Sequence, residues 1–141
     1  MNTLNFLDAN VWLALIWSRH SHSENAQEWF ARSEEEKFYY CRVTQITVLR
    51  LLTTSIVMGN DTRKMAEAWE LWDKVCADER VAFLPEPEAM EREFRRLSAM
   101  GSPSPKIWAD SYLLAFARVA GLKLVTFDRG LRARGTDVVI L

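Results

Sequence analysis

Apolar residues along the chain form short runs typical of strands, separated by longer segments in which they recur at helical spacing. Short apolar runs that are bounded by turn residues predict buried strands, and here they cover Thr3–Leu7, Phe38–Val43, Val81–Leu84, Lys123–Phe127 and Val138–Leu141. The intervening segments predict helices that begin near Asn10, Ser21, Thr44, Asp61, Glu88 and Ser104. This alternation predicts an α/β fold around a mostly parallel sheet of about five strands.

Capping signals refine these helix boundaries. Ser21 and Glu24 have the spacing of a capping box, in which two side chains satisfy each other's free backbone N–H groups. Asp61 is a suitable N-cap for the helix that follows it. Ser104–Pro105 combines an N-cap residue with proline at the first helical position, which predicts a helix start. Gly121 is the expected end of that helix.

Length and composition fit one globular domain over residues 1–141. Hydrophobic residues make up 49% and charged residues 26%, which excludes a disordered chain. No apolar run is long enough to span a membrane, and the first residues lack the basic segment of a signal peptide. Cys41 and Cys76 fit reduced thiols, so we expect a cytoplasmic protein. The net charge of −1 does not by itself indicate nucleic-acid binding.

Three aspartates occupy positions where a shared site can form. Asp8 and Asp128 each follow directly after a predicted strand. The carboxyl ends of parallel strands form the ligand crevice of an open α/β sheet, so both are expected at one edge. Asp110 lies in the first turns of the helix that precedes the Asp128 strand, on the same stripe as Ile107 and Leu114. A carboxylate on a core-facing stripe needs compensation of its charge.

Each aspartate also has a purely structural interpretation. Asp8 can cap the helix that follows it, and Asp128 can begin the turn at Arg129 and Gly130. Three converging carboxylates, however, repel one another unless a cation joins them. Oxygen ligands without histidine or cysteine favour Mg²⁺ or Mn²⁺, which commonly serve phosphoryl chemistry. We therefore predict that Asp8, Asp110 and Asp128 bind the metal ion and carry the catalysis.

Three segments resemble the landmark segments of PIN-domain toxins of the VapC class. They are Leu7–Trp12, Asp110–Ala115 and Leu124–Asp128, and the 18-residue step from Asp110 to Asp128 fits as well. The resemblance covers nearly the whole chain. It implies a single PIN domain with a Rossmann-like three-layer sandwich and a metal-dependent endoribonuclease activity on RNA phosphodiesters. It also implies a homodimer and a cognate antitoxin that holds the toxin inactive.

The resemblance has one departure, on the helix after the second strand. The family usually has a glutamate there, and our alignment places Arg50 at that position. A cation cannot bind metal, although a guanidinium suits contact with the scissile phosphate. The surrounding segment resembles a subgroup of the family that has arginine in place of this glutamate, so activity is still expected. The alternative hypothesis is a weak or inactive PIN domain that binds RNA or a protein without cleavage.

Two further residues are secondary candidates for the site. Asn10 either orients the Asp8 carboxylate or a metal-bound water, or it caps the next helix. Thr126 lies two residues before Asp128, on the same side of its strand. Arg50 is a further candidate, and Arg129, Arg132 and Arg134 are the main candidates for contacts with RNA phosphates.

Other features allow more than one interpretation. His20 and His22 lack a third metal ligand at matching spacing and fit a solvent-exposed pair before a helix, or else the rim of an RNA cleft. The tryptophans fit core packing by default. An apolar groove between the helices containing Leu49–Leu52 and Met65–Trp72 is a candidate site for an antitoxin helix. A phosphatase-like or nucleotide-binding enzyme is disfavoured, because no strand is followed by a glycine-rich phosphate loop or a nucleophile motif.

Overall fold

The computed structural model describes residues 3–34, 36–135 and 137–141. These residues form a five-stranded sheet in the order β3-β2-β1-β4-β5, and every neighbouring pair is parallel. The strands are β1 (Leu4–Leu7), β2 (Lys37–Tyr40), β3 (Val81–Phe83), β4 (Lys123–Thr126) and β5 (Val138–Ile140). The predicted α/β fold with its mostly parallel sheet is confirmed.

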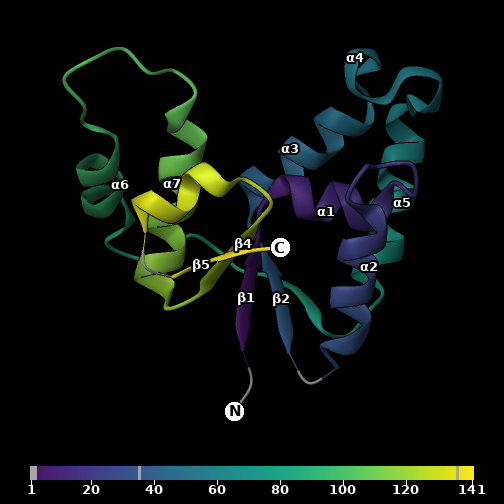
Figure 1. Cartoon of the computed structure of the whole chain (residues 1–141), viewed down its shortest axis with the longest axis horizontal. Helices are drawn as coiled ribbons and strands as arrows, with labels where there is room; N and C mark the ends of the chain where they lie inside the picture. Colours follow the sequence, from purple (N-terminus) through teal and green to yellow (C-terminus); the bar gives the residue numbers. More distant parts are fainter. Residues whose placement is uncertain (1–2, 35, 136) are drawn as a thin grey trace.

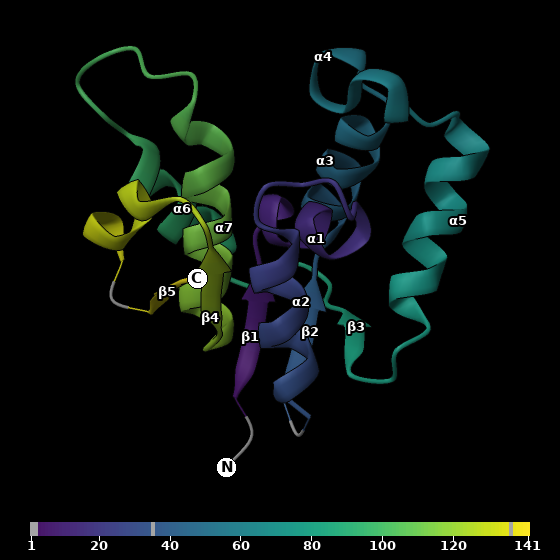
Figure 2. The same cartoon turned by 45° about the vertical axis from the view of Figure 1, so that its right-hand side comes forward.

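Helices cover both faces of the sheet and make a three-layer sandwich. Figures 1 and 2 show α6 and α7 on one face and α1, α2, α3 and α5 on the other. The α-helices are α1 (Ala9–Ile16), α2 (Ser23–Arg32), α3 (Arg42–Leu52), α4 (Ser55–Met58), α5 (Met65–Cys76), α6 (Met90–Ser98) and α7 (Ile107–Ala120). Two 3-10 helices, η1 (Gly59–Asp61) and η2 (Arg129–Arg134), complete the described elements. No helix in these residue ranges is long and apolar enough to cross a membrane.

The sheet separates two hydrophobic cores, because successive strand residues point to opposite faces. In β1, Phe6 packs on the α7 side, where its ring stacks on Phe116 at 4.6 Å between centroids. Leu7 packs on the α1 side with the buried Trp12 and Trp72, whose ring centroids lie 5.7 Å apart. Burial on both faces fixes the register of β1, and with it the position of the residue that follows the strand.

The predicted N-cap of α5 is wrong. The helix begins at Met65, where the backbone N–H of Lys64 donates to the Glu67 carboxylate at 2.9 Å. Asp61 instead accepts a hydrogen bond from the indole N–H of Trp17 at 2.9 Å. Asp61 therefore anchors the segment after α1, which lies 44 residues earlier in the chain, and this contact depends on tertiary packing.

Other boundaries are displaced by a few residues. The strand expected to continue to Val43 ends at Tyr40, because α3 already begins at Arg42. α2 begins at Ser23 after an N-cap, His22, whose side chain makes no capping bond, so the predicted capping box is wrong.

Helix α7 begins later and ends where the sequence predicts. Its first residue is Ile107, whose N–H bonds to the Ser104 carbonyl at 3.1 Å, two residues beyond the predicted start at Pro105. Gly121 ends the helix with a φ of +70°, a left-handed conformation that glycine adopts without a steric penalty. The helix end is thus confirmed.

Candidate active site

Asp8 stands directly after β1 and is fixed by its own hydrogen bonds. Its backbone N–H donates to the Val125 carbonyl at 2.9 Å, which extends the β1–β4 pairing by one residue. One carboxylate oxygen accepts from the Ala9 N–H at 2.7 Å, so Asp8 is the N-cap of α1. The other oxygen accepts from the Thr126 hydroxyl at 2.8 Å. Burial raises the pKa of Asp8, and these two hydrogen bonds partly oppose that shift.

The hydroxyl of Thr126 connects the ends of β1 and β4. Thr126 is fully buried, and while it donates to Asp8 it accepts from the Asn10 side-chain amide at 3.3 Å and from the Asp128 N–H at 3.0 Å. The Asn10 carbonyl oxygen accepts from the Phe127 N–H at 3.4 Å. Asn10 lies inside α1, so helix capping belongs to Asp8 alone. Thr126 and Asn10 are therefore placed to position the carboxylates.

Asp110 and Asp128 lie at the same edge of the sheet. Asp110 is in the first turn of α7, and burial raises its pKa, as does the negative charge of Asp128. The charges of Asp110 and Asp128 also raise the pKa of Asp8. Asp128 is exposed at the start of η2, where it accepts from the Gly130 N–H at 2.9 Å. The three predicted aspartates thus lie within electrostatic reach of one another, and we call them the acidic cluster.

The acidic cluster fits a hard divalent cation in its chemistry but is not a closed metal site. Carboxylates that repel one another are stabilised when a cation joins them, and oxygen donors suit Mg²⁺ or Mn²⁺. Within the described part of the chain, however, no group of three or more His, Cys, Asp or Glu side chains is placed to hold a metal ion. Asp8 and Asp128 use carboxylate oxygens for bonds to Thr126 and Gly130. Metal binding therefore requires rotation of at least some of these side chains.

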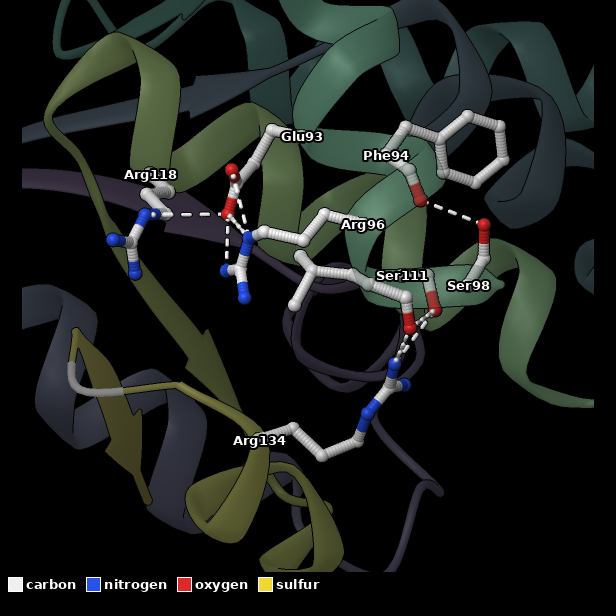
Figure 3. A network of polar contacts seen from close by, with 8 residues as sticks. Glu93, Phe94, Arg96, Ser98, Ser111, Arg118 and Arg134 are labelled. Carbon is white, nitrogen blue, oxygen red and sulfur yellow. Dashed lines mark hydrogen bonds and ion pairs between the residues drawn. The ribbon is translucent and has the colours of Figure 1, made fainter. Parts of the chain in front are cut away.

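Arg134 supplies positive charge close to this cluster. Figure 3 shows its side chain reaching from the end of η2 toward α6 and α7. One guanidinium nitrogen donates to the Leu97 carbonyl at 2.9 Å and to the hydroxyl of the buried Ser111 at 2.7 Å. Ser111 follows Asp110 directly, and the charge of Arg134 lowers the pKa of Asp110 against the effect of burial. Arg134 is therefore held by hydrogen bonds within the fold, and from there its positive charge acts on Asp110.

The other two candidate arginines of η2 have a different placement. Arg129 and Arg132 are exposed, and Arg129 follows Asp128 directly. Their guanidinium groups are accessible to a ligand, unlike that of Arg134. Both therefore stay candidates for contact with RNA phosphates.

The first turn of α3 also lies at the carboxyl edge of the sheet, because α3 starts at Arg42, soon after β2 ends at Tyr40. Gln45 is buried there and accepts a hydrogen bond from the Arg42 guanidinium. Arg50 lies about one and a half turns beyond Gln45 along α3, exposed in a groove that Ile46 and Trp69 also line. It is not among the charges that shift the pKa of Asp8 or Asp110. Gln45, which sequence reasoning missed, is thus a buried polar side chain in the first turn of α3, beside the buried Thr44.

His20 and His22 lie between α1 and α2 and contact Phe127, one residue before Asp128. The rings of His22 and Phe127 are stacked, with centroids 4.3 Å apart and planes at 15°. The His20 Nδ1 accepts from the His22 backbone N–H at 3.0 Å. Burial lowers the pKa of His20, and so does the neighbouring His22. The pair therefore borders the acidic cluster, and because His22 is exposed, both sequence-based interpretations stay open.

Known proteins with similar sequences identify the family. The profile of the PIN domain matches residues 6–136, which include all three aspartates. This chain belongs to the PIN-domain family. Ribonuclease VapC41 of Mycobacterium tuberculosis is 36% identical over 126 residues, 86% of each chain. Ribonuclease VapC29 of the same organism is 30% identical over 135 residues, 96% of this chain and 93% of that protein. The sequence thus places this PIN domain in the VapC class.

Solved structures show the same fold at much lower identity. The sarcin-ricin loop cleaving toxin VapC20 of Mycobacterium tuberculosis has a TM-score of 0.68 and 15% identity, covering 93% of this chain and 95% of that one. A chain of VapBC2 from Rickettsia felis, bound to a promoter DNA fragment, has a TM-score of 0.66 and 11% identity, covering 99% and 98%. At these identities the comparison supports the PIN fold and carries no information on individual residues.

Proposed function

We propose that this PIN domain is the toxin of a toxin–antitoxin pair and an endoribonuclease whose active site is the acidic cluster. The observation that carries the proposal is the convergence of three carboxylates at one sheet edge, where burial and mutual repulsion raise the pKa of Asp8 and Asp110. Such an arrangement is unfavourable unless a bound cation compensates it. The relatives that are named ribonucleases support RNA as the substrate.

Divalent metal ions are generally required by PIN-domain ribonucleases, and Mg²⁺ or Mn²⁺ suits this set of oxygen donors. Asp8, Asp110 and Asp128 would hold the ion, which supplies an activated water and neutralises charge on the phosphate. Thr126 keeps Asp8 oriented through its 2.8 Å hydrogen bond. The positive charge of Arg134 partly opposes the rise in the pKa of Asp110 that burial and Asp128 cause. The protein side chains therefore contribute by holding the three carboxylates together at the place where the phosphate would be attacked.

The RNA backbone is contacted by the arginines that stay exposed. Arg129 and Arg132 lie on η2 directly after Asp128. Contacts with phosphates give sequence-independent affinity that decreases with salt concentration. Arg129 and Arg132 would supply this attraction at an edge whose three carboxylates repel phosphate until a cation is bound.

An antitoxin is the expected protein partner, since several structural neighbours are toxin–antitoxin complexes. The candidate docking site is an apolar groove between α3 and α5 of about 310 Å³, in which Ile46, Met65 and Trp69 are exposed. An amphipathic antitoxin helix is suited to such a groove. We further propose a homodimer and a cytoplasmic location, where the free cysteines Cys41 and Cys76 stay reduced.

The alternative of a PIN domain that does not cut RNA was motivated by Arg50. In the structure Arg50 lines the apolar groove and is not among the charges acting on Asp8 or Asp110. It therefore gives no electrostatic reason for inactivity. Gln45 in the first turn of α3 is neutral, and its side-chain oxygen accepts a hydrogen bond from the Arg42 guanidinium.

The test is cleavage of total RNA by purified, antitoxin-free protein with Mg²⁺, Mn²⁺ or EDTA. We expect discrete metal-dependent fragments from the wild type and a loss of at least about 100-fold in Asp110→Asn, since even outer-shell changes at metal sites lower activity 10- to 100-fold. The matched control is Asp73→Asn, which neutralises an exposed carboxylate on α5 and is expected to cleave normally. Calorimetric titration with Mn²⁺ should show binding that Asp110→Asn lacks. Intact RNA in all conditions, from folded wild-type protein, would reject the proposed function.

A further inference from the structure

Three rings gather beside the acidic cluster and form what we call the ring platform: His20, His22 and Phe127. The His22 and Phe127 rings are stacked at 4.3 Å, and the His20 ring lies 6.4 Å from Phe127 with the planes at 27°. Phe127 is partly buried, whereas His22 is exposed. The Phe127 ring therefore supports one face of the His22 imidazole, and the exposed remainder of that side chain is accessible to a ligand.

The ring platform is held in place from two sides. Within the loop, the His22 N–H bonds to the His20 Nδ1 at 3.0 Å, and His20 also packs edge-on against Trp17 at 6.1 Å. The Trp17 indole N–H is anchored by Asp61. On the sheet side, the backbone N–H of Phe127 donates to Asn10, which also bonds to Thr126. The platform and the acidic cluster are thus connected by hydrogen bonds and by consecutive residues of the chain.

We propose that the ring platform binds an unpaired nucleobase of the RNA, adjacent to the phosphate that is cut. The inference rests on the proposed function, because the acidic cluster must be the cleavage site. Proteins recognise single-stranded RNA by stacking its bases on aromatic and histidine rings. Phe127 directly precedes Asp128, so we expect the stacked base on a nucleotide close to the reacting one.

The surroundings favour a base over the other ligands that histidines bind. The Nδ1 of His20 is already used as a hydrogen-bond acceptor, which leaves the pair poorly suited to chelate a metal ion. Burial and His22 lower the pKa of His20, which disfavours a charged imidazolium that would attract phosphate. The nearby carboxylate of Asp128 repels phosphate as well. The ring platform is therefore suited to a neutral, flat, aromatic ligand such as a nucleobase.

The experiment uses a single-stranded oligoribonucleotide that spans a cut mapped in total RNA, and analogues with one abasic nucleotide at each position near the cut. In the wild type, one abasic position is expected to lower kcat/KM by about five- to 100-fold, the range for loss of one stacked base. His22→Ala should lower cleavage of the intact oligonucleotide similarly and be insensitive to that abasic position. His22→Trp, which keeps a stacking ring, should restore the sensitivity. Ser21→Ala, an exposed neighbour in the same loop, is the matched control.

A binding measurement in EDTA separates the platform from the cleavage chemistry. We expect the fluorescence of a single 2-aminopurine at the sensitive position to be quenched by the wild type and by Ser21→Ala, but not by His22→Ala. If the wild type cuts no RNA, the proposed function fails. Base stacking on His22 can still be tested, by placing 2-aminopurine at each position of the RNA in turn and measuring whether its fluorescence is quenched by the wild type and not by His22→Ala. Wild-type behaviour of His22→Ala in both assays would overturn the inference. So would a defect of His22→Ala confined to antitoxin binding, which would assign the platform to a protein contact.

Discussion

The two ends of the sheet use aspartate in opposite ways. At the amino end, before β3, Asp78 forms a bidentate ion pair with Arg80, with distances of 2.7 and 2.9 Å. Arg80 also donates to the carbonyls of Phe30 and Ser33 and covers the Phe30 ring at 4.1 Å. Hydrogen bonding from Arg80 lowers the pKa of Asp78. This carboxylate is fully matched by its partner and stabilises the fold.

At the carboxyl end of the sheet, Asp8, Asp110 and Asp128 have no comparable bidentate ion pair with an arginine among the residues that the structure describes. Burial and mutual repulsion raise the pKa of Asp8 and Asp110, and the opposing positive charge on Asp110 comes from Arg134. The two ends thus contrast an aspartate whose charge is paired with aspartates whose charges repel one another, and only the second arrangement suits the proposed active site. A site that must accept a cation keeps a deficit of positive charge in the free protein, and the rest of the fold compensates for the instability.

The largest effect on stability is expected from breaking the matched pair. Arg80→Ala removes a bidentate partner of Asp78 and two carbonyl contacts, and should lower the free energy of unfolding by about 2–3 kcal/mol. Urea unfolding measures the change, and Arg80→Lys should give a smaller loss because it keeps the charge without the planar geometry. RNA cleavage well below the unfolding temperature should be unchanged. A large loss of cleavage by folded Arg80→Ala would mean that the two ends of the sheet are coupled.

A smaller loss is expected when the acidic cluster loses its internal cation. Arg134→Gln removes the bonds to Leu97 and Ser111 and leaves Asp110 less compensated, for a loss of about 1–2 kcal/mol in EDTA. The loss should be greater at pH 8 than at pH 4, because a larger fraction of the Asp110 carboxyl is ionised at the higher pH. Arg132→Gln, on the same 3-10 helix but exposed, should change stability by less than about 0.5 kcal/mol. Equal effects of the two substitutions at both pH values would contradict the role assigned to Arg134.

The smallest effect has the opposite sign. The pKa of Asp110 is raised in the folded protein above its ordinary value of 3.8, so the folded state holds this proton more tightly. Stability therefore falls as the pH rises from about 4 through the folded pKa. In EDTA at pH 7, Asp110→Asn should be more stable than the wild type, and the difference should vanish below pH 4.

Metal addition should reverse that order. Mn²⁺ binds the folded wild type and raises its stability by mass action, whereas Asp110→Asn gains less. Urea unfolding at pH 4 and pH 7, with and without Mn²⁺, measures both differences, and Asp73→Asn serves as the exposed control. A less stable Asp110→Asn in EDTA at pH 7 would show that the Asp110 charge is compensated in the free protein.

The fold and the positions of the acidic residues could be predicted because each depends on local sequence. Alternating strand and helix patterns specify a parallel α/β sheet, and Asp8 and Asp128 follow strands that are recognisable on their own. Arg50 shows where this reasoning reaches its limit. The strand before α3 was expected to end at Val43 but ends at Tyr40, and a shift of this size changes which turn of the helix lies at the edge. Gln45 was missed because no local pattern marks it, and its burial is decided by tertiary packing.

The sequence by itself therefore determined the order of elements, the family resemblance and the three aspartates, since periodicity and strand ends are properties of consecutive residues. Tertiary structure alone decided which groups surround those aspartates. Thr126 reaches Asp8 across 118 residues of sequence and Arg134 reaches Leu97 across 37, while His22 meets Phe127 only because the loop after α1 folds over β4. Such contacts depend on how buried faces pack, and packing brings together residues that no local pattern relates.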